Sequence, residues 1–446
     1  MAIGGVGMSG LALVMDRMGY KVSGCDLHPG DAAARLAAQG ITVFEGHDAA
    51  HLKGVGMVIA SAAIPDTNPE LLAAREARIP VLSRAEALGS LMDLKDGIAI
   101  SGTHGKTTTT SMVASVLEAA GLDPTILIGG DLDILGGNAK LGAGDLLVAE
   151  ACEAYGSFLE LFPRIAVILN IEHDHHDYYP TLESVLHGFR RFLGQIREGG
   201  LAVMCADCPN VRAVIPSVRQ RVVTYGLSED ADYRAVDVDA DCPTPAFRVV
   251  HDGRGLGEFE LRVPGEHNVR NALAAIAVGS ELGVAPDIMR DALAGFHGAG
   301  RRLEILGTVG DITVVDDYAH HPTEVRATIT AAHAWHRRLV VVFQPHLYSR
   351  TESLKDDFAD ALKAADALVL TEIYAAREKP KAGVSATMLV DLVNAQAPGK
   401  ATFIPDRHRV AEDLLPTLKP GDLVVVMGAG NIREAGEDLI RLLKQK

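Results

Sequence analysis

The chain has 446 residues, 48% of them hydrophobic, and about 150 residues per domain predicts roughly three domains. Its net charge of −16, with acidic and basic residues interspersed, argues against nucleic acid or an anionic membrane as a partner. Five scattered cysteines cannot form a disulfide framework, and Cys205 and Cys208 lack the second ligand pair of a zinc site. No signal-peptide pattern precedes the first motif and no apolar run approaches ~18 residues, so we expect a soluble, cytoplasmic protein.

The first predicted domain, residues 1–95, alternates strand and helix patterns, as parallel sheets with helical crossovers do. A glycine turn, a helix and two strands are expected in turn over residues 4–7, 9–18, 21–25 and 57–60. Only residues 1–3 precede the turn, whereas a normal strand has ~5–6 residues. We therefore expect the functional protein to begin upstream of Met1, the alternative being a stub strand at residues 1–3.

The second predicted domain, residues 96–300, opens with an apolar strand at 97–101. Further strands are expected to end at Glu150 and Asn170, followed by shorter, partly antiparallel strands over residues 201–265. The third domain, residues 301–446, contains four apolar runs typical of buried strands, at 313–315, 339–343, 367–370 and 423–427. The predicted fold is α/β, with Rossmann-like N-terminal and C-terminal domains flanking a central P-loop domain that has a mixed sheet.

The strongest motif lies between an apolar strand and an amphipathic helix of the second domain. It combines glycines, one lysine and hydroxyl side chains: Gly102, Thr103, His104, Gly105, Lys106, Thr107 and Thr108. Backbone amides of such a loop and the N-terminus of the following helix bind phosphate. Lys106 can reach the terminal phosphates of a nucleotide, and the Thr107 hydroxyl can bind Mg²⁺. The loop is shorter than the general G-x-x-x-x-G-K-[ST] pattern, and a glycine turn with an exposed lysine is the alternative.

Acidic residues and histidines at the ends of two strands are candidate Mg²⁺ ligands. Glu150 follows an apolar run, and a carboxylate at the carboxyl end of a parallel strand lies where ligands bind. Glu153 competes for this role, and a solvent-facing acid is the alternative. Three histidines closely follow Asn170, but no thiolate or distant ligand completes a zinc site around His173, His175 and His176. One histidine that assists a second Mg²⁺ or orients substrate is the simpler interpretation.

Amides and polar strand ends provide further binding candidates. Asn268 and Asn271 lie three residues apart on one helical face, where amides can read an adenine edge, although Asn is also an ordinary N-cap. In the third domain, polar residues follow apolar strands at 316–322 and 343–350. Each of these segments also fits a capped turn.

Five motifs occur in the order found in the Mur ligase family, which the chain resembles over essentially its whole length. They are GTHGKTTTT, N-I-E-x-D-H, H-N-x-x-N-A, DDYAHHPTE and F-Q-P-H-x-Y-x-R. The last two, together with the opening GGVGMSG, are similar to the family members that add L-alanine. The chain departs from the family pattern at Cys152, where many relatives have Asp, and at Leu347, where some have Arg.

This resemblance implies an N-terminal domain for a UDP-sugar, a central ATPase and a C-terminal domain that closes over the site. It implies ATP and Mg²⁺ as cofactors and UDP-N-acetylmuramate and L-alanine as substrates, in a monomer or homodimer that needs neither nucleic acid nor a membrane. The implied catalytic residues are Lys106, His175, His320 and Arg350. By matching position, it further implies phosphate contacts for the loop from Gly102 to Thr108 and metal contacts for Thr107, Glu150 and His175. It implies nucleotide contacts for Asn271, Arg302 and Asp317. The UDP-sugar pocket that it implies is lined by Gly4, Gly5, Gly7 and Asp26.

The implied reaction converts a carboxylate into an acyl phosphate by γ-phosphoryl transfer, after which a free amine attacks and phosphate leaves. Three alternatives stay open. One is a sister ligase that attaches a whole peptide to the same sugar acid, and another is a catalytically weak nucleotide-binding protein. The third is a nicotinamide-dependent dehydrogenase that uses the N-terminal glycine turn, because a G-x-G pattern alone is not specific.

Overall fold

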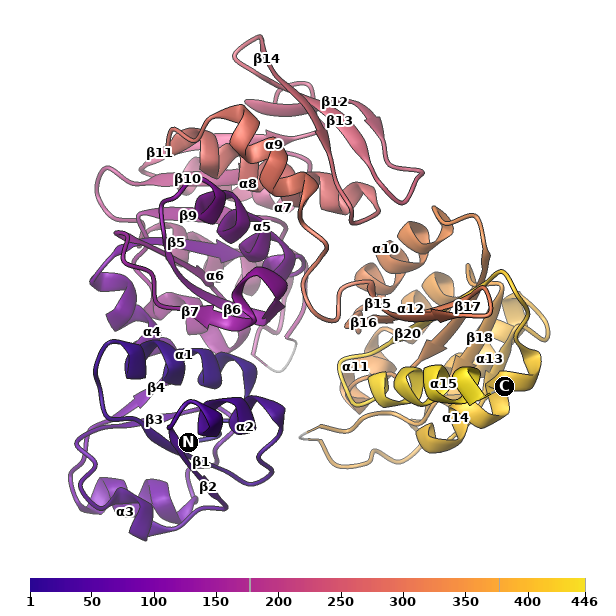
Figure 1. Ribbon diagram of the computed structural model, residues 1–446, viewed down its shortest axis with the longest axis horizontal. Coiled ribbons are helices and arrows are strands. Elements are labelled where there is room, and N and C mark those ends of the chain that lie inside the picture. Colours follow the sequence, from indigo (N-terminus) through magenta and orange to yellow (C-terminus); the bar gives the residue numbers. More distant parts are fainter. Residues whose placement is uncertain (176–177, 377, 446) are drawn as a thin grey trace. The chain divides into compact units, whose positions relative to one another are not determined.

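The computed structural model describes residues 1–175, 178–376 and 378–445 (Figure 1). The chain forms two compact units. The first unit comprises Met1–Val236, Arg248–Phe259 and Arg270–Phe296, and the second unit comprises Asp237–Phe247, Glu260–Val269 and His297–Lys446. Among the described residues, no helix combines the length and apolarity needed to cross a membrane.

The N-terminal part of the first unit contains two separate pairs of parallel strands. The pairs are β1 (Ser23–Asp26) with β2 (Thr42–Glu45), and β3 (Val58–Ala60) with β4 (Val81–Ser83). Residues 1–3 connect them, because the Ile3 amide donates to the Cys25 carbonyl at 3.1 Å and the Met1 nitrogen donates to the Ile59 carbonyl at 2.7 Å. The helices here are α1 (Val6–Arg17), α2 (Asp31–Ala38), α3 (Pro69–Glu76) and α4 (Arg84–Asp93).

Most of the remainder of the first unit is organised by one ten-stranded sheet, ordered β14-β13-β12-β11-β10-β9-β5-β8-β6-β7. Its strands are β5 (Asp96–Ser101), β6 (Thr125–Leu132), β7 (Gly137–Lys140), β8 (Leu146–Glu150), β9 (Ile165–Ile168), β10 (Leu201–Cys205), β11 (Arg221–Gly226), β12 (Tyr233–Asp239), β13 (Ala246–His251) and β14 (Arg254–Glu260). Strands β10, β9, β5, β8 and β6 are parallel, whereas β7 is antiparallel to β6. The sheet is therefore mixed, as expected. The helices are α5 (Lys106–Ala119), α6 (Leu182–Leu193), α7 (Pro209–Val214), α8 (Glu266–Glu281) and α9 (Pro286–Ala294). Short parts of β12, β13, β14 and α8 fall in the residue ranges of the second unit.

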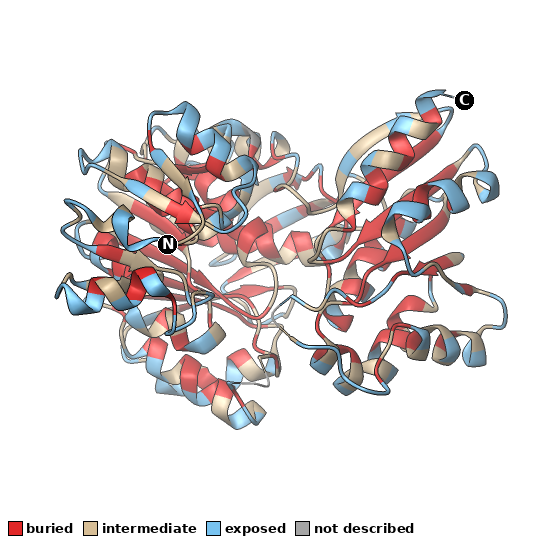
Figure 2. Cartoon of the chain, turned by 90° about the horizontal axis from the view of Figure 1, so that it is seen from below, coloured by how far each residue is buried: buried red, intermediate tan, exposed pale blue. Residues whose placement is uncertain are grey.

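The core of this sheet is continuous and almost entirely apolar, since its central strands are buried on both faces. Phe158, Phe189 and Phe192 anchor it, with ring centroids 5.2 and 4.9 Å from that of Phe158. Figure 2 shows the buried residues gathered along the strands. A rigid sheet of this kind holds the loops at its strand ends in fixed positions.

The second unit is built on a six-stranded sheet, ordered β15-β16-β20-β17-β18-β19. Its strands are β15 (Glu304–Val309), β16 (Ile312–Asp317), β17 (Arg338–Phe343), β18 (Ala367–Leu370), β19 (Ala401–Phe403) and β20 (Asp422–Met427), all parallel except β15. Helices α10 (Pro322–His333), α12 (Lys355–Leu362) and α13 (Thr387–Gln396) share one apolar cluster, and α14 (Arg407–Leu414) and α15 (Arg433–Gln445) share another. The short helix α11 (Tyr348–Ser353) follows β17. Helices thus cover both faces of the sheet, the doubly wound arrangement.

The α/β class and the main strands expected from the sequence are confirmed. All four apolar runs of the last domain lie in strands β16, β17, β18 and β20. The boundaries differ by a few residues: helix α1 begins at Val6, not at residue 9, because the glycine turn passes directly into it with Gly5 as the N-cap. Strand β9 ends at Ile168, two residues before Asn170.

Candidate functional site

A glycine-rich loop joins β5 to α5, and its backbone requires glycine at two positions. Gly102 and Gly105 have φ angles of 147° and 84°, in the left-handed region that side chains disfavour. A Cβ atom at Gly105 would lie 2.9 Å from Oδ1 of Asn271, and one at Gly102 would lie 3.0 Å from Cβ of Leu169. Asn271 of α8 therefore lies directly against the loop, beside the N-terminus of α5.

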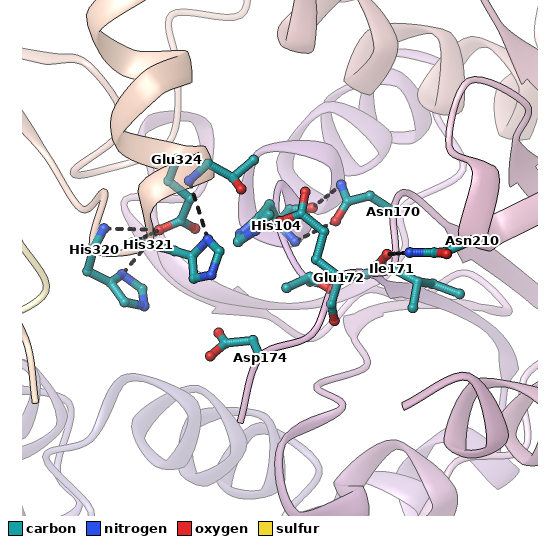
Figure 3. A network of polar contacts seen from close by, with 12 residues as sticks. His104, Asn170, Ile171, Glu172, Asp174, Asn210, His320, His321 and Glu324 are labelled. Carbon is teal, nitrogen blue, oxygen red and sulfur yellow. Dashed lines mark hydrogen bonds and ion pairs between the residues drawn. The ribbon is translucent and has the colours of Figure 1, made fainter. Parts of the chain in front are cut away.

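The segment that follows β9 fixes this loop through hydrogen bonds (Figure 3). Asn170 accepts from the His104 amide at 2.8 Å and donates to the His104 carbonyl at 3.0 Å. The Glu172 amide donates to the Thr103 hydroxyl at 2.8 Å, and the Glu172 carboxylate lies 3.3 Å from Nε2 of His104. Hydrogen bonds from the segment after β9 thus fix the loop backbone, which preorganises its amides for phosphate.

The side chain of Lys106, the first residue of α5, lies over the loop, where two backbone carbonyls and one carboxylate bind its ammonium. Its ammonium donates to the carbonyls of Gly102 at 2.5 Å and Thr103 at 3.1 Å, and lies 2.9 Å from Oε2 of Glu153. Glu153 is only 2% exposed and also lies 3.6 Å from Nε2 of His175. Burial disfavours both charges, but their attraction prevails, so the pKa of Lys106 is raised and that of Glu153 is lowered. Lys106 is therefore a charged ammonium at the helix N-terminus.

The residues predicted to bind metal belong to the same unit. Glu150 ends β8 opposite Ile100 of β5, and its Oε1 accepts from the Gly129 amide at 2.6 Å. A Cβ atom at Gly129 would lie 2.8 Å from both carboxylate oxygens of Glu150, so glycine allows this close approach. The Glu150 carboxylate and the buried Thr107 hydroxyl are hard oxygen donors, which suit Mg²⁺.

His175, the third predicted metal ligand, is oriented differently. Its φ angle of 54° is left-handed, and its amide donates to Oδ1 of Asp174 at 2.7 Å. This conformation places its imidazole beside Glu153, the partner of Lys106. His176 and Asp177 lie outside the described residues.

The N-terminal glycine turn is held by an acidic side chain. The Gly4 amide donates to Oδ2 of Asp26 at 2.9 Å, while Oδ1 of Asp26 accepts from the His28 amide at 3.0 Å. Gly5 is the N-cap of α1, and a Cβ atom at Gly7 would lie 3.0 Å from Nη1 of Arg84. The four residues predicted to line a UDP-sugar pocket, Gly4, Gly5, Gly7 and Asp26, are therefore brought together.

Helix α1 is also attached to the central sheet. The Asn138 amide nitrogen, on β7, donates to the Val6 carbonyl at 2.5 Å. Strand β7 pairs with β6, the strand that carries Gly129 and so contacts Glu150. A continuous set of backbone elements therefore links the N-terminal turn to the candidate metal ligand.

In the second unit, Asp317 organises the turns around Arg302. Asp317 ends β16, and its carboxylate accepts from the amides of Leu303 and Ala319, both at 2.8 Å. Burial raises the pKa of Asp317, although the Arg302 charge opposes the shift. The Arg302 guanidinium carbon lies 5.3 Å from the ring centroid of Tyr318, within cation–π range. Arg302 and Asp317 are thus held in one local structure.

His320 and Arg350 belong to a second polar group in this unit. Nδ1 of His320 lies 2.9 Å from the Tyr318 carbonyl, and the Glu324 carboxylate accepts from the His320 amide at 3.0 Å (Figure 3). Burial lowers the pKa of His320 even though Glu324 opposes the shift, which favours a neutral imidazole. The His346 ring lies edge-on, 5.6 Å from that of His320, and Nη1 of Arg350 lies 3.2 Å from Nδ1 of His346.

Two residues near the loop were not selected as site residues from the sequence. Asn170 was identified only as a strand end, yet its side chain accepts a hydrogen bond from the loop backbone. Glu153 was identified only as a competitor of Glu150, yet it pairs with Lys106. The N-I-E-x-D-H motif contains Asn170 and was the available signal. Cys205 is buried, and burial raises the pKa of its thiol to about 11.

Comparison with protein families gives three matches along the chain. Residues 1–96 match the Mur ligase family catalytic domain, residues 100–279 the Mur ligase middle domain, and residues 301–430 the Mur ligase glutamate ligase domain. Together these matches cover most of the chain.

Individual relatives agree. The UDP-N-acetylmuramate–L-alanine ligase of Geotalea daltonii is 48% identical over 444 residues, covering 99% of this chain and 97% of that protein. The ligase of the same name from Myxococcus xanthus is 46% identical, with coverage of 99% and 94%. Among solved structures, the UDP-N-acetylmuramate-alanine ligase of Thermotoga maritima matches with a TM-score of 0.86 and 30% identity, covering 100% of this chain and 98% of that one. A murein peptide ligase of Psychrobacter arcticus matches with a TM-score of 0.74, 26% identity and the same coverages.

Proposed function

The chain belongs to the Mur ligase family, and we propose that it is an ATP-dependent ligase that joins L-alanine to the carboxylate of UDP-N-acetylmuramate. Ligases of that name at 46–48% identity over nearly their full length support this substrate pair. The observation that carries the ATP-dependent step is the charged Lys106 ammonium, held by Glu153 at the N-terminus of α5 beside a preordered glycine loop.

In this proposal the loop amides and Lys106 bind the ATP phosphates and stabilise the charge that develops as the γ-phosphoryl group is transferred. Glu150, Thr107 and His175 are the residues that would hold Mg²⁺, which supplies charge neutralisation for that transfer. Asn271, already in contact with Gly105, is placed for the adenine edge. Gly4, Gly5, Gly7 and Asp26 line the UDP-sugar pocket.

In this proposal Arg302 and Asp317 contact the nucleotide, and His320 and Arg350 contact the substrate. The neutral imidazole that donates Nδ1–H to the Tyr318 carbonyl has Nε2 as its basic nitrogen. We assign this atom to the proton that the L-alanine ammonium must lose before it attacks the acyl phosphate. The model-compound pKa of such an amine is near 8, so a weak base is sufficient.

We further propose domain boundaries after residues 95 and 300.

We propose that the protein acts in the cytoplasm, where ATP is available, as a monomer or homodimer that needs neither nucleic acid nor a membrane. Its product is a peptidoglycan precursor, which links the reaction to cell-wall growth, cell shape and division.

The test is phosphate release with UDP-N-acetylmuramate, ATP and one candidate amine at a time. L-Alanine should be the best amine, with L-serine and glycine slower, because one methyl contributes only ~1–3 kcal/mol of discrimination. Mass spectrometry should show a gain of one alanine residue. Preferential addition of glutamate would overturn the assignment.

A tripeptide is the informative competitor, because the Psychrobacter arcticus structure, a murein peptide ligase, also matches over the whole chain. Attachment of the tripeptide in preference to L-alanine would identify a peptide ligase instead. In either case, release of phosphate without any amine should be slow, because the acyl phosphate then has only water as acceptor.

A further inference from the structure

A cluster of metal-binding side chains lies in the N-terminal part of the first unit, and none of its four residues has a role in the proposed ligase chemistry, although Cys25 directly precedes Asp26. Cys25 is on β1 and Glu70 is in the first turn of α3. His47 follows β2, and His51 lies in the short 3-10 helix Ala49–Leu52 that comes next. Cys25 and Glu70 are buried, at 1% and 4% exposure. We propose that Cys25, His47, His51 and Glu70 bind one Zn²⁺ ion.

The donor atoms lie near the spacing that a tetrahedral zinc site requires, and two of their separations are a few tenths of an ångström shorter. Bonds of ~2.0–2.3 Å at tetrahedral angles place the ligand atoms about 3.3–3.6 Å apart. Here Sγ of Cys25 lies 3.0 Å from Oε2 of Glu70 and 3.3 Å from Nδ1 of His47, and the latter is 3.1 Å from the same oxygen. Nδ1 of His51 is 3.6 Å from Oε1 of Glu70, and the ligand atoms of Cys25, His51 and Glu70 all lie within 4.8 Å of one another.

The orientation of the His51 imidazole supports this assignment. The ring of His51 stacks on Phe44, with centroids 4.2 Å apart and planes 9° from parallel, so Nδ1 is directed toward Glu70. That nitrogen is inaccessible to solvent and has no hydrogen-bond partner among the described residues. A buried imidazole nitrogen without a hydrogen bond is costly, and a metal–nitrogen bond would satisfy it.

Charge also favours a cation at this position. A buried carboxylate is stable only when it is paired, and the groups that face Glu70 here are the Cys25 thiol and the two imidazoles. The Met1 ammonium attracts Glu70 and Cys25, but its hydrogen bond goes to the Ile59 carbonyl. Zn²⁺ would displace the Cys25 thiol proton to solvent, and one thiolate and one carboxylate would balance its two charges.

With four protein donors the site leaves no open position for substrate, which is the pattern of a structural zinc ion. It would connect β1, the segment after β2 and α3, three segments that also share a small apolar cluster including Leu71 and Ala74. The mixed donor set also distinguishes it from a Mg²⁺ site, since thiolate and imidazole are ligands that Zn²⁺ prefers and Mg²⁺ does not.

The experiment is a titration of the metal-free full-length protein with Co²⁺ and then Zn²⁺, without ATP or UDP-sugar. Wild type should bind one equivalent of Co²⁺ with a thiolate-to-metal absorption band, which Zn²⁺ should abolish by displacement. Cys25→Ser should remove the band and weaken Zn²⁺ binding at least ~10-fold. Cys242→Ser is the matched control and should behave as wild type, because the Cys242 thiol donates to the backbone carbonyls of Asp239 and Thr244, away from the cluster.

Glu70→Gln provides a second variant that removes one charge but keeps a hydrogen-bonding side chain. It should retain the thiolate band while binding Zn²⁺ more weakly. Binding of no Co²⁺ by wild type, or a band that persists in Cys25→Ser, would show that the cluster is only a hydrogen-bond network. Because the readout needs no ligation, its failure would leave the proposed ligase activity untouched.

Discussion

The two glycine turns of the first unit share a local design but differ in their side-chain partners. Each leads directly into a helix, α1 after Gly5 and α5 after Gly105. In the N-terminal turn a carboxylate, Asp26, accepts from the backbone itself at Gly4. In the second turn the neutral amide of Asn170 binds the backbone, and the carboxylate of Glu153 binds the Lys106 side chain instead.

This difference indicates how one backbone design can serve two ligands. The second turn combines helix-terminal amides with a fixed cation, which suits a triphosphate whose charge is redistributed during reaction. The N-terminal turn contains no lysine or arginine within residues 4–10 and relies on backbone geometry, which suits a substrate that is bound but not transformed at its phosphates. The glycine pattern alone therefore did not distinguish a dehydrogenase from a ligase. The side-chain partners of each turn, together with the family, favour the ligase.

The largest expected effect is that of Lys106→Ala, which removes the cation that distinguishes the second turn. Losing a preorganised charge at a transition state costs ~10²–10³ in rate, so phosphate release should fall by that factor. Binding of UDP-N-acetylmuramate, measured by calorimetry without ATP, should be unchanged. Lys140→Ala is the control, because Lys140 pairs with Glu118 and Asp123 away from the loop. A Lys106→Ala enzyme that keeps a third of wild-type turnover would exclude this lysine from the mechanism.

Glu153→Gln should lower stability more than any change in the N-terminal turn. The substitution leaves the Lys106 ammonium in a buried site without its counter-charge, and breaking such a pair costs about 3 kcal/mol or more. Urea unfolding at pH 7 measures the loss. A urea unfolding curve that matches that of the wild type would show that the Lys106–Glu153 pair does not form in solution.

The same pair predicts a pH dependence. The pKa of Glu153 in the folded protein is below its usual 4.5, because attraction to Lys106 and His175 outweighs burial. The unfolded chain therefore takes up a proton first as the pH falls, and the contribution of Glu153 is complete above pH 4.5 and lost as pH falls through the folded value. The stability gap between wild type and Glu153→Gln should accordingly narrow below pH 4.5, and a constant gap would contradict the pairing.

The sequence predicted those parts of this site that depend on local order along the chain. The strand, glycine loop, lysine and helix around residues 102–108 are contiguous, and the run before Glu150 is apolar enough to define its strand end. The Lys106–Glu153 pair joins residues 47 positions apart, and spacing could not show which of two nearby acids faces the lysine. The site-residue assignments themselves stay predictions until the variants are measured.

The sheets were predictable for the same reason. Strands that are buried on both faces appear as unbroken apolar runs, as at residues 339–343 of β17 and 423–427 of β20. The cluster of Cys25, His47, His51 and Glu70 was not predicted, because it depends on the packing of β1, α3 and the segment that follows β2. No periodicity in the sequence encodes a contact of that kind.

A direct comparison of the turns comes from adding one methyl group to each. Gly105→Ala forces a side chain into a left-handed backbone with φ of 84° and places Cβ 2.9 Å from Asn271, so it should destabilise the protein by ~1–3 kcal/mol and raise the KM for ATP. Gly5→Ala meets only the Ala2 carbonyl, at 3.4 Å, in an ordinary extended conformation, and should cost less than ~1 kcal/mol. Thermal melting of both variants measures the contrast. Equal losses would show that the two turns are constrained alike.

The smallest expected effect is that of Asp26→Asn in the N-terminal turn. The carboxylate accepts from two amides, those of Gly4 and His28, whereas an asparagine side chain has one accepting oxygen and turns its NH₂ group toward the other donor. One lost hydrogen bond costs about 1 kcal/mol, so the KM for UDP-N-acetylmuramate should rise roughly fivefold while the KM for ATP stays constant. Asp131→Asn is the control, because Asp131 is an exposed acid that pairs with Arg35 and belongs to neither turn. If Asp26→Asn raised the KM for ATP as much as that for the sugar, the N-terminal turn would not be a separate UDP-sugar site, and the two turns would have to serve one ligand.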